Sequence, residues 1–245
     1  MKENIYDNEQ FFEKYSHFPR SVAGLSAAGE WHELKKLLPD FHGKRVLDIG
    51  CGFGWHCMYA AENGAETVLG TDISSKMLAV VNEKNTFDNV HYQQIAMEDI
   101  DFAPNSFDVV MSSLAFHYTP DFRAICERIS HCLTVGGQLI FSVEHPVFTA
   151  FGTQDWIYDE DGKPKYWPVD HYFTDGKRNA VFLGESVVKY HKTLTTYLNT
   201  LLQTGFTITG IVEPEPGAEL LDTVPGMRDE LRRPMMLLVS ATKAA

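Results

Sequence analysis

The sequence predicts an α/β fold in which a parallel sheet is covered by helices on both faces. Two observations predict it. Strand-like apolar runs alternate with amphipathic stretches after residue 43, and a glycine-rich turn closes the first run. The expected strands are RVLDIG, ETVLGTD, VHYQQIA, FDVVMSS and GGQLIFSVE, with FTITGIVEP and RPMMLLVSATK near the C-terminus. A chain of 245 residues that is 44% hydrophobic can bury the core of one such domain.

Helix signals lie between these strands. The first helix is expected after Gly54 and ends near Asn63-Gly64, a pair suited to a left-handed helix stop. The second begins near Ser74, which is a suitable N-cap. A third opens at Thr119-Pro120, where the hydroxyl caps and proline takes the first helical position. A last helix is expected in TLTTYLNTLLQTG.

We expect a single domain, 1–245, made of four parts. Residues 1–43 precede the first strand and form a helical cap over the carboxyl edge of the sheet, and residues 44–145 form the core. Residues 146–192 are rich in aromatics, Gly, Pro and Asp and show neither helical nor strand periodicity. Long segments of this kind are often lids or binding loops, so a lid is expected. Residues 193–245 add the last helix and strands.

Composition restricts the classes of partner and location. The net charge of −12 disfavours nucleic acid, because the densest cationic stretch, Arg228 to Arg233, is interrupted by acids. No apolar run approaches the roughly 20 residues of a membrane span, and the N-terminus lacks a secretory apolar segment, so we expect a cytoplasmic protein without a membrane partner. The four cysteines form no CxxC pair or zinc-type spacing, which predicts reduced thiols and no metal. The oligomeric state is not indicated.

The turn after the first strand has the chemistry of a nucleotide-binding loop. Glycines at positions 50, 52 and 54 permit a tight turn and close approach of a ligand to backbone N–H groups. A nicotinamide-binding turn would read GxGxxG, but its last position holds Trp55. Asp72 ends the second strand, where a carboxylate can accept both hydroxyls of a ribose. Residues 97–99 follow the third strand and either contact an adenine edge or form a solvated acidic turn.

The motifs VLDIGCGFG, GTDIS, MEDIDF and SFDVVMSSLAFHY together resemble those of class I S-adenosylmethionine-dependent methyltransferases, in order and in spacing. The flanking stretches AGEWHELKKLLPDFHGKRVLDIGCGFGWH, FSVEHPVFTA, KYHKTL and ELRRPMMLLV are similar to a bacterial small-molecule methyltransferase-like group of unknown substrate. The resemblance covers nearly the whole chain. It implies a Rossmann-like, doubly wound, seven-stranded sheet whose last strand is antiparallel.

The resemblance also implies the residues that bind the nucleoside half of the cofactor. Asp72 would hold the ribose and Ile73 would cover the adenine. Met97 would meet the ring edge through its backbone, and Glu98 would approach the exocyclic amine. The pattern departs at Ala96, where many relatives carry an acid, so Glu98 would have to supply that contact.

For the methionine half, the resemblance places Gly50, Cys51 and Gly52 beside the cofactor. Tyr15 and Arg20 in the cap would close over this end, with Arg20 pairing the cofactor carboxylate, or Arg20 is a surface residue. The expected cofactor-binding set is completed by Met77 and Ser112.

Methyl transfer from a sulfonium is an in-line displacement that needs positioning and exclusion of water more than a dedicated catalytic group. For an alcohol, phenol or acidic carbon a general base helps, and the candidates are His117, His145 and His191, with His117 alternatively capping the next helix. Aromatic residues of the insertion either wall an apolar or aromatic substrate or pack the insertion onto the sheet. They are Trp156, Tyr158, Tyr166, Trp167, Tyr172 and Phe173.

The sequence therefore predicts transfer of a methyl group from S-adenosyl-L-methionine to an O-, N- or C-nucleophile on a small organic molecule, in a lidded pocket. One alternative is a non-catalytic protein that binds S-adenosylmethionine or S-adenosylhomocysteine. The other is a nicotinamide-dependent oxidoreductase, which the glycine spacing and the lack of an identifiable hydride-transfer set disfavour.

Overall fold

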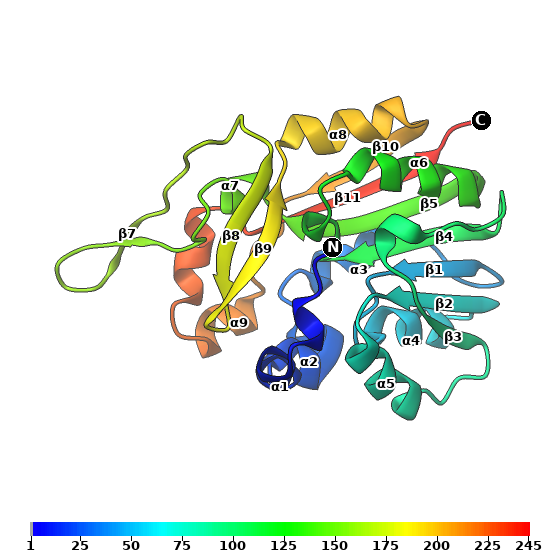
Figure 1. Ribbon diagram of the computed structural model, residues 1–245, viewed down its shortest axis with the longest axis horizontal. Coiled ribbons are helices and arrows are strands. Elements are labelled where there is room, and N and C mark those ends of the chain that lie inside the picture. The colour runs from blue at the N-terminus through cyan, green and yellow to red at the C-terminus, as the bar shows by residue number, and fades with distance from the viewer. Residues whose placement is uncertain (1) are drawn as a thin grey trace.

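The computed structural model describes residues 2–245 and is built around a seven-stranded sheet (Figure 1). Its strand order is β10-β11-β5-β4-β1-β2-β3. The strands are β1 (Arg45–Ile49), β2 (Thr67–Asp72), β3 (Val90–Gln94), β4 (Phe107–Ser113), β5 (Leu133–Glu144), β10 (Phe206–Val212) and β11 (Met236–Lys243). Strands β1 to β5 pair in parallel, and β11 is antiparallel to both β5 and β10. The expected sheet with an antiparallel last strand is confirmed.

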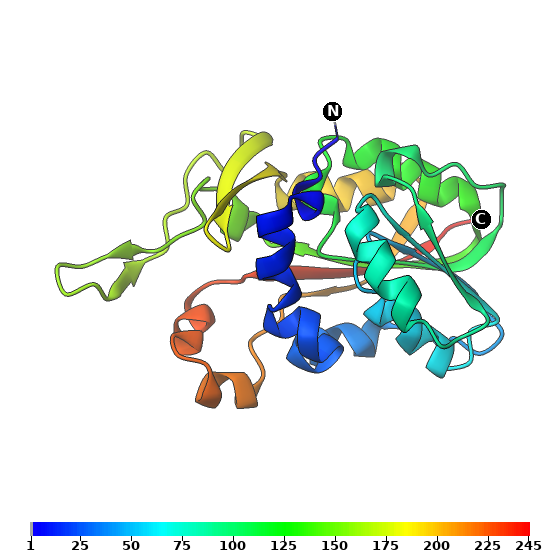
Figure 2. The ribbon, with the colours of Figure 1, turned by 60° about the horizontal axis from the view of Figure 1, so that its bottom comes forward.

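The central strands are apolar because both faces of the sheet are covered. On one face, the core joins β1, β4 and β5 to α6 (Phe122–Cys132) and α8 (Leu194–Gln203). On the other face, it joins the sheet to α3 (Trp31–Leu37), α4 (Trp55–Glu62) and α5 (Ser75–Lys84). Figure 2 shows the sheet between these two layers of helices.

The helix starts follow local capping chemistry. Helix α4 begins after Gly54 and is followed by Asn63, and the Ser74 hydroxyl accepts a hydrogen bond from the Met77 N–H at the start of α5, both as predicted. The predicted start of α6 at Thr119-Pro120 is wrong, because the Thr119 hydroxyl accepts from the Asp121 N–H within the preceding turn and the helix begins only at Phe122. Asp121 caps α6 instead and accepts from the Ala124 N–H at 3.0 Å.

Short helices form the segment before β1. They are the 3₁₀ turn Ile5–Asp7, α1 (Glu9–Ser16), α2 (Pro19–Ala23), the 3₁₀ turn Gly24–Ala27 and α3. The carboxylate of Asp7 accepts from the Ser74 hydroxyl at 2.6 Å, which ties the first turn to the start of α5. The N-terminal segment therefore sits at the carboxyl edge of the sheet.

The insertion after β5 is more regular than its sequence predicts. It contains α7 (Pro146–Thr149) and two antiparallel hairpins, β6 (Ile157–Tyr158) with β7 (Pro164–Tyr166) and β8 (Gly176–Phe182) with β9 (Glu185–His191). The β6–β7 hairpin projects from the body, while β8–β9 runs toward α1 (Figures 1 and 2). Between β10 and β11, the acidic loop carries α9 (Ala218–Thr223) and the 3₁₀ helix Met227–Arg232.

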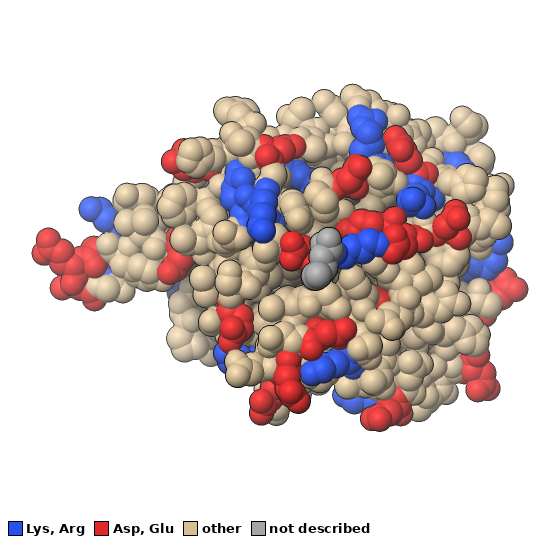
Figure 3. Space-filling model, in the orientation of Figure 1, with Lys and Arg blue, Asp and Glu red and all other residues tan. Residues whose placement is uncertain are grey.

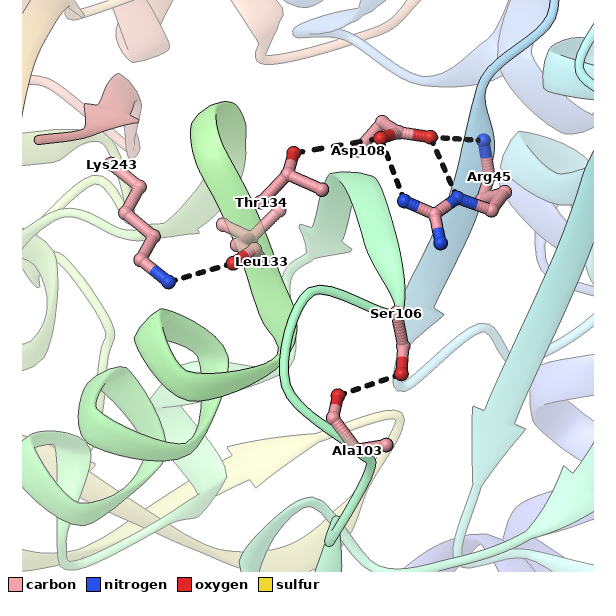
Figure 4. Close-up of polar contacts among 7 residues, drawn as sticks. All are labelled: Arg45, Ala103, Ser106, Asp108, Leu133, Thr134 and Lys243. Carbon is pink, nitrogen blue, oxygen red and sulfur yellow. Dashed lines mark hydrogen bonds and ion pairs between the residues drawn. The ribbon is translucent and has the colours of Figure 1, made fainter. Parts of the chain in front are cut away.

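Side-chain hydrogen bonds link neighbouring strands at the amino edge of the sheet. Arg45 at the start of β1 donates through Nε and Nη2 to the Asp108 carboxylate of β4, each at 3.0 Å (Figure 4). Lys243 at the end of β11 donates to the Leu133 carbonyl at 2.7 Å. Within residues 2–245, no helix is both long and apolar enough to cross a bilayer.

Candidate active site

A cavity of about 170 Å³ opens at the carboxyl edge of the sheet. The sheet edge supplies the glycine loop and the ends of β2, β4 and β5, and the opposite walls come from the N-terminal segment and the β8–β9 hairpin. Residues that represent each wall are Gly52, Asp72, Ser113 and Glu144 from the sheet, Tyr6, Tyr15 and Arg20 from the N-terminal segment, and Phe182 and Lys189 from the hairpin.

The glycine loop presents bare backbone to this cavity. Gly50, Gly52 and Gly54 all have positive φ angles, of 72°, 53° and 72°. A Cβ on Gly50 would lie 2.6 Å from the Ala115 side chain, so a larger residue there would clash. A Cβ on Gly52 would meet no atom within 4 Å, and Gly52 lines the cavity. The loop is therefore a cradle that an incoming ligand can approach closely.

Asp72 is held in a fixed orientation beside this loop. Its Oδ2 accepts from the Gly52 N–H and its Oδ1 accepts from the Ser74 N–H, both at 2.8 Å. Burial raises the pKa of this carboxyl, while the two backbone N–H groups oppose that shift. Each oxygen retains a free lone pair. The carboxylate can therefore accept two ligand hydroxyls without reorienting.

The expected nucleoside-side residues lie along one wall. Ile73, Met77, Met97 and Glu98 all line the cavity, and Ala96 lines it beside them. They come from the ends of β2 and β3, from α5 and from the 3₁₀ turn Met97–Asp99. The structure brings these side chains together with Asp72, and their individual roles stay predictions.

Tyr15 and Arg20 also line the cavity, from the N-terminal segment. The guanidinium of Arg20 is 18% exposed and donates to Glu30 Oε1 at 2.5 Å and to Ser113 Oγ at 2.8 Å. Glu30 is itself only 1% exposed. Arg20 is therefore a half-buried, paired cation at the cavity wall rather than a surface residue.

Two expected cofactor residues lie outside the cavity lining. The Ser112 hydroxyl donates to the Ile49 carbonyl at 2.8 Å and so joins β4 to β1. The Cys51 side chain is buried against β2 and β3, where it packs beside Gly70 and Tyr92. Both side chains serve the sheet, although the backbone of Cys51 lies in the loop between Gly50 and Gly52, which line the cavity.

Of the three histidines, His117 alone lines the cavity. Its Nδ1 accepts from the Glu144 N–H at 3.4 Å, and burial lowers its pKa to about 3. The ring is therefore neutral near pH 7 with its proton on Nε2. This geometry favours hydrogen-bond donation to a ligand over proton abstraction from it.

The other two histidines have structural partners, contrary to the catalytic expectation. His145 caps α7, with its Nδ1 accepting from the Val147 N–H at 3.0 Å. His191 is fully buried between the Thr149 hydroxyl, 2.7 Å from Nδ1, and the Tyr172 carbonyl, 2.8 Å from Nε2. Neither lines the cavity.

The insertion aromatics do not form the expected substrate wall. Trp167 stacks on Phe148 with ring centroids 4.9 Å apart, and the Arg233 guanidinium lies 3.9 Å from the Trp167 ring centroid. Phe173 is 92% exposed. The aromatic residues that line the cavity are instead Tyr6, Tyr15, Phe18, Tyr118 and Phe182.

Sequence reasoning missed Glu144 and Lys189, which also line the cavity. Glu144 ends β5, as Asp72 ends β2, so the position of an acid at a strand end was a usable signal. Lys189 had no such signal, because its approach to the cavity depends on the register of a hairpin that the sequence pattern does not reveal.

A family model described as a methyltransferase domain matches residues 47–141. A crystal structure of a Listeria monocytogenes protein, assigned as an S-adenosylmethionine dependent methyltransferase, is 58% identical, with a TM-score of 0.86 over 91% of this chain and 100% of its own. An S-adenosylmethionine dependent methyltransferase of Mesorhizobium loti is 39% identical, with a TM-score of 0.83 over 90% of this chain and 100% of its own. An uncharacterized protein of Haemophilus influenzae is 32% identical over 99% of this chain and 98% of its own length.

The fold, the glycine cradle and the match to the methyltransferase domain together define a methyltransferase with a Rossmann-like fold. The chain belongs to the class I S-adenosylmethionine-dependent methyltransferases, with S-adenosylmethionine as its cofactor.

Proposed function

We propose that this methyltransferase acts on a small organic molecule that is enclosed between the sheet edge, the N-terminal segment and the β8–β9 hairpin. One observation carries the proposal: three separate segments wall a single cavity that also contains the cofactor cradle. The covering segments meet each other, since Lys14 of α1 donates to Glu185 of β9 at 2.6 Å and Phe182 packs on Phe11. A cavity covered in this way suits a free molecule better than a residue within a polymer.

The residues present fit the cofactor. Gly52 offers open space for close approach, and the Asp72 carboxylate, oriented by backbone N–H groups, offers acceptors for the ribose hydroxyls. We assign the adenine wall to Ile73, Met97 and Glu98, and the methionine end to Tyr15 and Arg20. When bound, S-adenosylmethionine supplies an electrophilic methyl group on a sulfonium sulfur.

The chain's own task is to position the acceptor and to exclude water. Gly52, Asp72, Tyr15 and Arg20 would hold the cofactor, which would supply its methyl group to a nucleophilic oxygen, nitrogen or carbon of the bound acceptor. If the methyl acceptor reacts through an O–H or N–H group, the proton of that group passes to solvent or to a nearby basic group. The neutral His117 ring can hold the acceptor by donating from Nε2.

Charge and cysteine state support a small-molecule acceptor in the cytoplasm. The net charge of −12 opposes a polyphosphate acceptor. The described chain holds its four cysteines as free, buried thiols, which fits a reducing compartment.

A transfer assay separates the acceptor classes. Protein with methyl-labelled S-adenosylmethionine is incubated with a bacterial extract split into low-molecular-mass, tRNA and protein fractions. We expect label in the low-molecular-mass fraction, and much less with Asp72→Ala, because that variant lacks the ribose acceptor. Label confined to tRNA or protein would contradict the proposal. Cofactor binding without label in any fraction would favour the non-catalytic alternative.

A further inference from the structure

A buried polar group lies in the cavity wall where the end of β5 meets the β8–β9 hairpin. Lys189 of β9 donates to Oε1 of Glu144 at the end of β5, and also to Oε1 of Gln154 at 2.9 Å. The Gln154 amide in turn donates to Oε2 of Glu144 at 2.6 Å. The Lys189 and Glu144 side chains are 4% and 15% exposed, and both line the cavity.

This group keeps unused hydrogen-bonding capacity. An ammonium has three N–H donors, and Glu144 and Gln154 take two of those on Lys189. A carboxylate has about four acceptor sites, and Lys189 and Gln154 use two of those on Glu144. The pair thus has one donor and two acceptor sites free for a ligand.

The backbone indicates that this arrangement is specified rather than incidental. Gln154 has a positive φ of 53°, a backbone conformation that is unfavourable for most residues other than glycine. Its side chain bonds both members of the pair. Gln154 is therefore a positioning residue that fixes Glu144 and Lys189 from outside the cavity.

The neighbouring surfaces are aromatic. The Lys189 ammonium lies 5.5 Å from the centroid of the Phe182 ring. The hydroxyls of Tyr6 and Tyr118 are 3.0 Å apart, and both residues line the cavity. These residues give the cavity both ring faces and ring edges, against which an aromatic ligand can pack.

We infer that Glu144 and Lys189 recognise the methyl acceptor, and that the acceptor is a small, planar, uncharged molecule with a hydrogen-bond donor next to an acceptor. This inference rests on the proposed function. The pair is neutral as a unit, so it offers no net charge to balance an anionic or a cationic acceptor, whose charge would be desolvated without compensation. A neutral group with adjacent donor and acceptor satisfies both members.

Four fluorinated probes of similar size test the inference on protein loaded with S-adenosylhomocysteine. They are 4-fluorocatechol, which has the proposed pattern, 4-fluorobenzoate, 4-fluorobenzylammonium and fluorobenzene, and binding is followed by fluorine NMR. We expect 4-fluorocatechol to bind about tenfold or more tightly than each of the others, as hydrogen bonds to charged groups typically give.

The variant Glu144→Gln with Lys189→Met removes both charges together and so leaves no lone charge buried. We expect it to abolish the preference for 4-fluorocatechol while S-adenosylhomocysteine still binds within about threefold of wild type. Glu33→Gln with Lys36→Met is the matched control, because this exposed pair on α3, 2.6 Å apart, lies outside the cavity.

Three results would overturn the inference: tighter binding of a charged or apolar probe, binding of no probe by loaded protein, or an unchanged preference in the cavity variant. Failure to load S-adenosylhomocysteine is a different result, because it contradicts the proposed function itself.

Discussion

His117 shows how burial decides the chemistry of a single side chain. The imidazole is 2% exposed, and desolvation lowers its pKa to about 3 even though the Glu144 carboxylate nearby favours the charged form. Its Nδ1 lone pair is engaged by the Glu144 N–H. The ring is thus neutral at the cavity wall, a state that favours hydrogen-bond donation over the general-base role expected from the sequence.

The buried, neutral state of His117 makes the free energy of unfolding depend on pH. The unfolded chain protonates His117 below a pKa of about 6.5, whereas the folded chain resists protonation down to about 3. Between these values the unfolded state binds more protons, so the free energy of unfolding falls as pH is lowered, by up to about 1.4 kcal/mol per pH unit. We expect His117→Gln to show a shallower loss of stability in this window, measured by denaturant titration.

Only the difference between the variant and the wild type is diagnostic. Asp48 acts with the opposite sign, because burial raises its pKa to about 7 and the folded state then binds the extra proton. An identical pH profile for both proteins would show that His117 does not carry the assigned shift.

At the scale of elements, the β8–β9 hairpin and the N-terminal helices depend on each other. Phe182 lies 5.9 Å from Phe11, 6.3 Å from Tyr15 and 5.8 Å from Phe18, measured between ring centroids. These contacts join a segment near residue 15 to one near residue 180 directly over the cavity. Loosening them should open the cavity without disturbing the sheet.

Phe182→Ala tests this coupling. We expect faster amide hydrogen exchange in β8–β9, faster release of S-adenosylhomocysteine and a loss of about 1–3 kcal/mol in unfolding free energy. Val181→Ala is the control on the same strand, because Val181 is 63% exposed and should change stability by less than about 0.5 kcal/mol. Equal ligand release rates for the two variants would mean that the hairpin does not close the cavity.

The sequence predicted some of these elements but not others. The buried run of β1 and the cap at Ser74 act locally, so they were predictable. Burial alternates along the β8–β9 hairpin, but its buried positions include the polar residues Lys189 and His191, so the sequence does not show an alternation of polar and apolar residues. Lys189 reaches the cavity only through that pairing, which explains why Asp72 was predicted and Lys189 was not.

At the scale of the whole molecule, charge restricts the partner. Acidic and basic side chains are interspersed over the face in Figure 3, with acidic groups on the projecting β6–β7 hairpin, whose turn includes Asp159, Glu160 and Asp161. With a net charge of −12, the surface should repel a polyphosphate. The seven-stranded sheet agrees with the class that the motifs predicted, whereas Glu144 and Lys189, to which we assign the acceptor, were found only from the tertiary structure.

We therefore expect no specific binding of tRNA. Fluorescence anisotropy of labelled tRNA should give a dissociation constant of about 10⁻⁴ M or weaker, which is the weak limit of non-specific nucleic-acid binding. Micromolar binding that weakens steeply with added salt would instead reveal a phosphate-binding surface and argue for a nucleic-acid acceptor.

The central claim is that the glycine cradle and Asp72 form the site for S-adenosylmethionine. Its most direct test is calorimetric titration with S-adenosylmethionine and, separately, NAD, using wild type, Asp72→Ala and the control Asp88→Ala, since Asp88 is exposed. We expect wild type to bind S-adenosylmethionine with micromolar affinity and not to bind NAD. Asp72→Ala should weaken the binding of S-adenosylmethionine about tenfold or more, because about 1–3 kcal/mol is lost when buried hydrogen bonds go unmade. Asp88→Ala should leave this affinity unchanged. Preference for NAD, or equal affinities in wild type and Asp72→Ala, would contradict it.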